Sequence, residues 1–344
     1  SSLKSINLDN FNTEKVTKMS GLFQGCTSIT SLSLRYFKTR NVNYMQTMFL
    51  DMTALEALDI SKFDTSSVIY FRQMFKNCYS LKSIYVSNFN TSFARDMGSF
   101  FHNCHSLTSI NLANFNTSLV QDFGYMFYNC TSLKEINLNN FRTPLATVIS
   151  HLFDNCTSLT SFDISNFDTK NVKDMSFLFK SCISLTSINL KNFVTDKTTH
   201  MGHMFENCDK LESIEYNNWD LSYVLDLSYM FSDCPALKSV DISSFETPLV
   251  RDISYMFNNC RSLTSLDFSK FITVEVTNME KMFYSCKGLN NLDITSFTNF
   301  RCNNFKNIFD ECNGLTVIIN NEKCPNIFGY IPEYINIVNR TEKI

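Results

Sequence analysis

The chain has 344 residues, and its 30 Lys plus Arg against 33 Asp plus Glu leave a formal net charge of −3. This balance excludes the broad basic field of a nucleic-acid-binding protein and the polybasic segment of a membrane anchor. Apolar residues make up 44% of the sequence, enough for a sizeable core. No run approaches the length of a membrane-spanning helix, and the first ten residues lack the pattern of a signal peptide.

A period of 26 residues runs through most of the chain. Ten cysteines from Cys78 to Cys312 are each 26 residues apart, and Cys26 keeps the same phase, with Met52 standing between them. Three residues before each of these twelve positions is a phenylalanine, and eleven residues after most of them is another aromatic residue. A fixed period of this length predicts a repeat architecture. We number positions in each repeat relative to this cysteine column, which is position 0.

Each repeat contains two predicted elements. Apolar residues at −10, −7, −4, −3 and 0 have helical spacing and predict a short helix. Apolar residues at +6 and +8 alternate with polar ones and predict a short strand. In one repeat the helical positions are Val172, Met175, Leu178, Phe179 and Cys182, and the strand positions are Ile188 and Leu190.

The motifs of the repeat resemble a known family. The segment Leu107 to Phe115 has the L-x-x-I-x-L-x-x-F spacing of a leucine-rich repeat, and Thr169 to Cys182 reads TKNVKDMSFLFKSC. Together they resemble the BspA-type leucine-rich repeats of bacterial surface proteins, whose 26-residue unit also recurs in mycoplasma lipoproteins. The resemblance covers residues 1 to about 320. It implies a surface protein that adheres to host matrix proteins or to other cells.

The expected fold is a right-handed α/β solenoid of the leucine-rich-repeat kind, whose 26-residue units each carry one short helix and one short parallel strand. Residues 1–320 are predicted to form about twelve such repeats, with the strands in one continuous ladder. Residue 1 falls within a repeat, so we expect a fragment of a longer chain without its N-terminal cap. Residues 321–344 are predicted to be a C-terminal cap, and a linker to a further domain is the alternative.

The candidate ligand site is a column of rings at position −5, between the apolar columns at −7 and −4. Outside this block the column carries residues such as Gly21 and Lys281. Aromatic rings are common anchors of binding energy, so the column is a hypothesis for a ligand surface. Packing of the rings between neighbouring helices is the alternative. The six residues are Tyr125, His151, Phe177, His203, Tyr229 and Tyr255.

A second column is acidic and lies on the predicted outer face of the strands. Glu215, Asp241, Asp267 and Asp293 occupy position +7 in four successive repeats. Like charges at this spacing repel, and calcium favours carboxylate oxygens, so a weak hypothesis is a metal site. Plain hydration of exposed carboxylates is the alternative.

The cysteines and histidines give little indication of chemistry. No C-x2-C pair exists, and the eleven cysteines of the column are expected to be reduced core residues. Cys302 and Cys324 lie off this column, and a disulfide between them is a hypothesis for an exported protein. Neither a complete metal-ligand set nor a catalytic triad is found, so we predict no cofactor and no enzymatic activity.

The predicted function is therefore a non-catalytic adhesion module at a cell surface or in a secreted protein. It would display an extended surface for a protein or glycan ligand on another cell or on the matrix, without nucleic acid and without a membrane span. The alternative is a structural or assembly module, a stalk or coat built from stacked repeats. The oligomeric state stays open.

Overall fold

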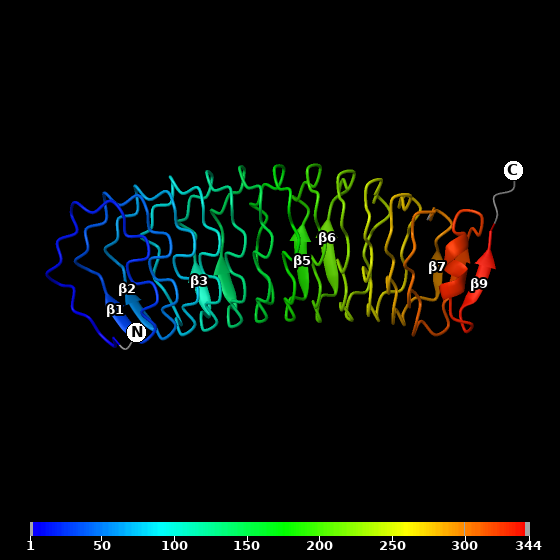
Figure 1. The fold of residues 1–344 in the computed structure, drawn as a ribbon, viewed down its shortest axis with the longest axis horizontal. Coiled ribbons are helices and arrows are strands. Elements are labelled where there is room, and N and C mark those ends of the chain that lie inside the picture. Colours follow the sequence, from blue (N-terminus) through cyan, green and yellow to red (C-terminus); the bar gives the residue numbers. More distant parts are fainter. Residues whose placement is uncertain (1–2, 299, 341–344) are drawn as a thin grey trace. The chain divides into compact units, whose positions relative to one another are not determined.

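The computed structural model describes residues 3–298 and 300–340. The chain forms two compact units, Ser1–Asn171 and Val172–Ile344. Each unit is a stack of 26-residue coils (Figure 1). The uniform period gave no sign of this division, because the sequence columns run through it without an insertion.

In the described part of the chain the predicted strands form in eight of the twelve repeats and pair in parallel, whereas the repeats around Ser83, Phe162, Val240 and Leu266 have no strand. In both pairs of unit 1 each residue pairs with the residue 26 positions later, as Ile110 does with Ile136. The strands form separate sheets with the orders β1–β2 and β3–β4 in unit 1 and β5–β6 and β7–β8–β9 in unit 2, instead of one continuous ladder (Figure 1). Their bounds are β1 Ser31–Ser33, β2 Ala57–Asp59, β3 Ser109–Asn111, β4 Glu135–Asn137, β5 Ser187–Leu190, β6 Ser213–Tyr216, β7 Asn291–Asp293, β8 Thr316–Ile319 and β9 Asn336–Asn339.

The predicted helix in each repeat is wrong. Positions −8 to −1 form a series of tight turns, and among the described residues the single helical element is the 3-10 helix η1, Pro325–Tyr330. Residues at −5 and −1 have positive φ, for example 56° at Ser99 and 61° at Asn103. A right-handed helix requires negative φ throughout, so these two positions interrupt it in every coil.

Hydrogen bonds explain why turns replace the helix. The amides of Ser99, Phe101 and Asn103 donate to carbonyls of the next coil at 2.8 Å. The amides between them donate three residues back, as Phe100 does to Met97 O at 3.2 Å. Apolar residues spaced for a helix therefore also fit a chain of three-residue turns, whose alternate amides join neighbouring coils.

We call positions −8 to −1 the turn side and positions +4 to +9 the strand side. On the turn side, parallel bridges at position −8 connect every successive coil from Lys18 to Val148 in unit 1 and from Asp174 to Asn304 in unit 2. In unit 1 the asparagines at −1 add a side-chain ladder, in which Asn103 Nδ2 donates to Asn77 Oδ1 at 2.7 Å. The turn side thus carries the more regular pairing between coils.

The core follows the predicted columns. Phenylalanines at −3 stack on one another within each unit, with ring centroids 5.3 Å apart for Phe49 and Phe75 and 5.4 Å for Phe179 and Phe205. The aromatic residues at +11 are also buried, with the exception of Phe11 in the first coil. A buried threonine column closes the corner after the strand, as Thr39 Oγ1 donates to Asp64 O at 2.9 Å. The predicted inward Phe columns are therefore confirmed.

The segment after residue 320 adds two elements to unit 2. The helix η1 begins at Pro325, and β9 pairs in parallel with β8, with Val317 opposite Ile337. β9 thus extends the β7–β8 sheet by one strand (Figure 1). The prediction that 321–344 is a cap stays a prediction, and residues 341–344 lie outside the described part.

Candidate functional site

The ring column lies on the turn side, at the first of the two positive-φ positions in each coil. Its φ angles include 59° at Tyr125 and 56° at Tyr229. For a bulky residue this left-handed conformation costs about 1 kcal/mol or more, whereas Gly and Asn adopt it readily. Gly21 and Asn307 occupy the equivalent positions in the first and last coils. The rings therefore stand where backbone conformation alone would favour other residues.

Within each unit the rings stack face to face along the coil axis. In unit 2 the centroid distances are 4.3 Å from Phe177 to His203, 4.6 Å from His203 to Tyr229 and 4.4 Å from Tyr229 to Tyr255. In unit 1 Tyr125 and His151 stack at 4.2 Å. Such pairs are worth about 0.5–1.5 kcal/mol each beyond their buried area, which offsets the cost of the positive φ.

The stacking also determines what the column offers to a ligand. Tyr125 is 37% exposed, and the other five rings are half-buried. Because neighbouring rings cover their faces, mainly the ring edges are accessible. The rings therefore do pack against the rings of neighbouring coils, as the alternative interpretation expected. Their edges nevertheless remain at the surface.

Polar partners fix the rings at their edges. His203 Nδ1 lies 2.7 Å from Glu206 Oε2, and Lys180 Nζ contacts the same oxygen at 2.7 Å. Burial by itself would raise the pKa of Glu206, but the hydrogen bonds from His203 and Lys180 outweigh it and lower the pKa. In unit 1 His151 Nδ1 is held at 2.7 Å by Asp154 Oδ2. Each imidazole therefore has one nitrogen committed to a carboxylate.

The column ends at Tyr255, which lies beside the charged residues Glu280 and Lys281. The Tyr255 hydroxyl donates to Glu280 Oε1 at 3.1 Å, and Lys281 Nζ lies 5.3 Å from the ring centroid. Burial, followed by the bond to Glu280, raises the pKa of Tyr255 to about 12. The hydroxyl is therefore a neutral donor throughout the physiological range.

Unit 1 contains further rings that the sequence analysis missed. His102 stacks on Tyr128 at 4.7 Å and lies 5.9 Å from Tyr125, while Tyr79 stacks on His105 at 4.9 Å. These residues occupy positions −2 and +1, where most other coils carry no ring. Burial first, and then the charges of Lys76, His105 and His151, lower the pKa of His102 to about 4. The aromatic surface of unit 1 is thus wider than the predicted column.

The acidic column on the strand side has a structural role. Asp241, Asp267 and Asp293 each accept a hydrogen bond from the backbone N–H two residues later, and Glu215 lies 2.9 Å from Lys191 Nζ. Backbone and side-chain hydrogen bonds from Ser269 lower the pKa of Asp267. In residues 3–298 and 300–340 no three His, Cys, Asp or Glu side chains are grouped to hold a metal ion. The structure gives the calcium hypothesis no support.

The disulfide between Cys302 and Cys324 stays a prediction. In the structure Cys302 is a thiol whose Sγ donates to Asn304 O at 3.6 Å. It stands at position −10, in the core column that holds Val120 and Val276 in other coils. Cys302 is a small core residue there, and burial raises its pKa to about 11.

The cysteine column is buried from Cys78 onward, whereas Cys26 is half-buried. Cys130 Sγ donates to Phe101 O of the preceding coil at 3.2 Å, and the same bond recurs at Cys78 and Cys260. Burial raises the pKa of Cys130 to about 12. A thiol with so high a pKa is a poor nucleophile, so Cys130 is not reactive at neutral pH.

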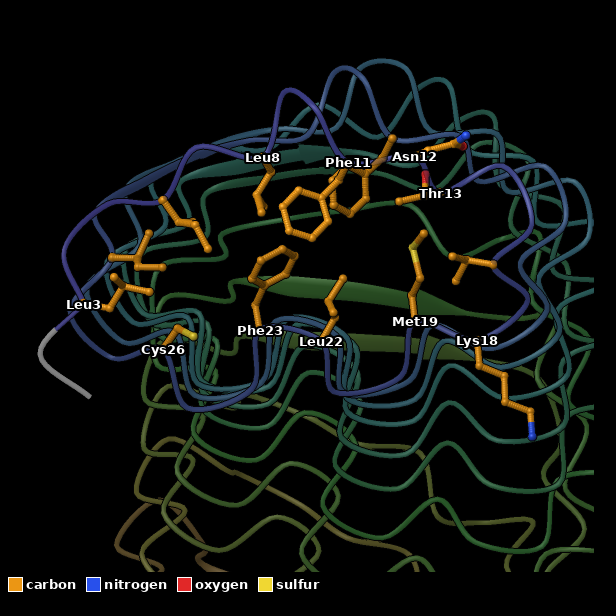
Figure 2. Close-up of a pocket in the computed structure, with 14 residues that line it drawn as sticks. Leu3, Leu8, Phe11, Asn12, Thr13, Lys18, Met19, Leu22, Phe23 and Cys26 are labelled. Carbon is orange, nitrogen blue, oxygen red and sulfur yellow. The ribbon is translucent and has the colours of Figure 1, made fainter.

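An apolar cavity of about 390 Å³ lies at the first coil. Leu8 and Phe11 from one side, and Met19 and Phe23 from the other, point into this space (Figure 2). These residues belong to the core columns that later coils fill, since Phe11 is 60% exposed and its equivalent Phe37 only 4%. The cavity is therefore lined mainly by residues of the core columns, with Asn12, Thr13 and Lys18 as its polar lining.

These features define a parallel repeat solenoid of the leucine-rich-repeat type, built from turns and short strands. The sequence matches the family described as "Mycoplasma protein of unknown function, DUF285", with overlapping matches at residues 1–110, 59–143, 97–215, 133–238 and 209–322. The chain belongs to this family, which confirms the resemblance drawn from its motifs. No curated protein matches the sequence.

Two solved structures of bacterial proteins are similar. A leucine-rich repeat protein from Bacteroides ovatus is 18% identical, with 95% of this chain and 88% of that chain covered and a TM-score of 0.47. A leucine-rich cell surface protein from Faecalibacterium prausnitzii is 19% identical, with 80% and 82% covered and a TM-score of 0.39. In the described part of the chain no helix is long and apolar enough to cross a membrane.

Proposed function

We propose that this chain is a non-catalytic binding module of a surface or secreted protein, and that its ligand surface is the ring column on the turn side. The ligand class is a protein or glycan on another cell or on the matrix. The observation that carries the proposal is a run of stacked rings in each unit, two in unit 1 and four in unit 2, at a position that carries no ring in the other coils. Positive φ at this position is shared by every coil, so the rings and not the backbone conformation distinguish this block.

The strand side supports the proposal by contrast. Its outward Asp and Asn side chains cap their own turns, as Asp163 does for Ser165 and Asn137 for Asn139. Their hydrogen-bonding capacity is partly used within the coil, and few rings lie among them. The ring column instead presents edges that carry hydroxyl and imidazole groups beside apolar carbon, a combination common in binding hot spots.

A binding assay with matched variants tests this function. Purified protein is passed over immobilised matrix proteins and a glycan array, and the double variant Tyr229→Asn, Tyr255→Asn is compared with wild type. Asn adopts positive φ, so the backbone of both positions is retained. The control is Tyr85→Asn, which removes a 66% exposed tyrosine on the strand side, outside the column.

We expect the double variant to bind at least about tenfold more weakly, because truncation of an aromatic anchor commonly costs about 2 kcal/mol. The control should bind as wild type does. Unchanged affinity of the double variant, or an equal loss in the control, would contradict the ring column as the ligand surface.

The rival function, assembly of copies side by side, is favoured by one surface of unit 2. Four exposed apolar residues follow one another in successive coils at positions −11 and −12: Tyr223, Leu249, Val274 and Phe300, exposed by 59%, 43%, 41% and 65%. Contiguous apolar residues often mark protein contacts. Sedimentation velocity over a range of concentrations tests it, since a concentration-dependent oligomer that Phe300→Ser abolishes would favour assembly.

A further inference from the structure

A surface pocket of about 420 Å³ in unit 1 is lined by four cationic side chains and one carboxylate: Arg35, Lys38, Arg40, Lys62 and Asp64. Buried Thr39 and Phe37 form its floor. The whole chain is slightly acidic, with a net charge of −3, so this concentration of positive charge is a local feature. In the described part of the chain, none of the four cations lies within ion-pair distance of a carboxylate.

Neighbouring coils show which residues occupy position +12, the position of Lys38 in this pocket. Position +12 carries Asn or Asp in six of the twelve coils from residue 12 to residue 298, and each of these side-chain oxygens accepts a hydrogen bond from the amide two residues later. Asn12 Oδ1 accepts from Glu14 N at 3.0 Å, Asp64 Oδ1 from Ser66 N at 3.0 Å and Asn90 Oδ1 from Ser92 N at 3.0 Å. In these coils an oxygen thus caps the turn.

The coil between them lacks this oxygen. Lys38 occupies position +12, and its backbone follows the same course, since Lys38 N donates to Thr13 Oγ1 at 2.7 Å as Asp64 N does to Thr39 Oγ1 at 2.8 Å. Among the described residues Arg40 N donates no hydrogen bond to the protein. This exposed amide therefore lies free to donate beside a pocket that four cationic residues line.

The charges within the pocket do not cancel. Asp64 is already engaged, because the side chain and backbone of Ser66 both hydrogen-bond to it and lower its pKa, with a smaller effect from Arg40. Arg35 lines the pocket, its Cζ lies 4.7 Å from the ring centroid of Tyr36, and its charge contributes, after the hydrogen bonds from Ser61, to lowering the pKa of Asp59. The four cations still outnumber the two carboxylates that they influence, Asp59 and Asp64.

We propose that this pocket binds a tetrahedral oxyanion group, a phosphate or sulfate ester, with one oxygen accepting from Arg40 N and the others facing Arg35, Lys38 and Lys62. A phosphate monoester carries about −1.5 to −2 charges at neutral pH and three acceptor oxygens, which suits several donors at once. The volume equals that of roughly ten or more waters, so the oxyanion and part of the molecule that carries it both fit. This site lies apart from the ring column and does not depend on it.

Isothermal titration calorimetry of the purified protein with inorganic phosphate, inorganic sulfate and acetate tests the proposal. The decisive variant is Lys38→Asn, which installs the residue that Asn12 and Asn90 provide in neighbouring coils and so restores the cap. Lys62→Ala removes a second cation. Its matched control is Lys270→Ala, because Lys270 is an exposed lysine at the same position, +10, of a coil in unit 2.

We expect wild type to bind phosphate and sulfate, Lys38→Asn to bind at least about tenfold more weakly, Lys62→Ala to weaken binding to a smaller extent, and Lys270→Ala to match wild type. Binding should weaken as the salt concentration rises. Tighter binding of phosphate would identify a phosphate ester as the natural group, and tighter binding of sulfate a sulfate ester. The proposal is overturned if wild type binds neither ion, if acetate binds as tightly, or if Lys38→Asn binds as wild type does.

Discussion

The turn side and the strand side of the coils differ in how they hold neighbouring coils together. On the turn side, four amides donate to the next coil in every coil that has a following coil within its unit, and in each unit the bridges at position −8 continue without a gap. On the strand side, strands of three or four residues pair in twos or threes, and some coils, such as the one containing Ser83, have no strand. The turn side therefore provides the more rigid platform, and it is the side that carries the rings.

The largest effect is expected when proline is introduced on each side of a coil in unit 1. Ser99→Pro removes the bond from Ser99 N to Gly124 O at 2.8 Å and cannot adopt the φ of 56°. We expect a loss of about 3 kcal/mol or more in the free energy of unfolding, measured by urea denaturation.

The matched change on the strand side is Ser83→Pro. In the described part of the chain the amide of Ser83 donates no backbone hydrogen bond, so we expect a loss below about 1 kcal/mol. Equal losses for the two variants would contradict the unequal roles of the two sides.

A smaller effect is expected from removing one ring on each side. Tyr229→Asn gives up stacking on His203 and Tyr255 but relieves the positive φ, so we expect a net loss of about 1–2 kcal/mol. Tyr85→Asn removes a strand-side tyrosine that is 66% exposed and makes no ring contact in the described part, and should cost less than about 0.5 kcal/mol. Thermal unfolding of both variants measures these two losses of stability. Equal losses for the two variants would show that stacking of the column rings does not stabilise the fold.

The turn side of unit 1 should also be sensitive to acid. The folded pKa of His102 is about 4, below the ordinary value of 6.5, so the folded state favours the neutral ring. This contribution to stability is complete above pH 6.5 and is lost as the pH falls from 6.5 to 4. Between pH 6.5 and pH 4 the free energy of unfolding of His102→Phe should therefore fall by about 1–2 kcal/mol less than that of wild type, a figure already reduced for solvent screening. Parallel stability profiles for the two proteins would contradict this assignment.

The smallest effect is expected at the strand-side acids. Asp241→Asn keeps an oxygen for the amide of Ser243, now 3.1 Å away, so stability should stay within about 0.5 kcal/mol of wild type. Asp241→Ala removes the cap and should cost about 0.5–1 kcal/mol. If both variants are equally destabilised, the negative charge of Asp241 itself stabilises the fold. A cation bound by the acidic column would then explain the result better than the turn cap does.

The sequence predicted the period, the inward columns and the strands, because each depends on which residues are buried. It did not predict the turns, because apolar residues at −7, −4, −3 and 0 are spaced alike for a helix and for a chain of three-residue turns. A signal was present in the asparagines at −1, such as Asn103 and Asn129, since Asn favours positive φ. Asp226 at −8, which caps Ser228 N at 2.8 Å, is a second sign of a turn.

The candidate site was predicted in part for the same reason. The period located the ring column, but whether the rings stack or stand apart depends on backbone angles that periodicity does not contain. The rings of His102 and Tyr128 were missed because only three coils carry a ring at position −2, the third being Tyr284. The uncapped amide of Arg40 becomes evident only by comparison with the hydrogen bonds of neighbouring coils.

Native-state amide hydrogen exchange tests most directly whether the turn side is the platform of the molecule. The account predicts that the amides of Ser99, Phe101 and Asn103, which donate to the next coil, exchange orders of magnitude more slowly than the amides of the strand-side segment around Ser83. Equal protection on both sides, or faster exchange on the turn side, would contradict it.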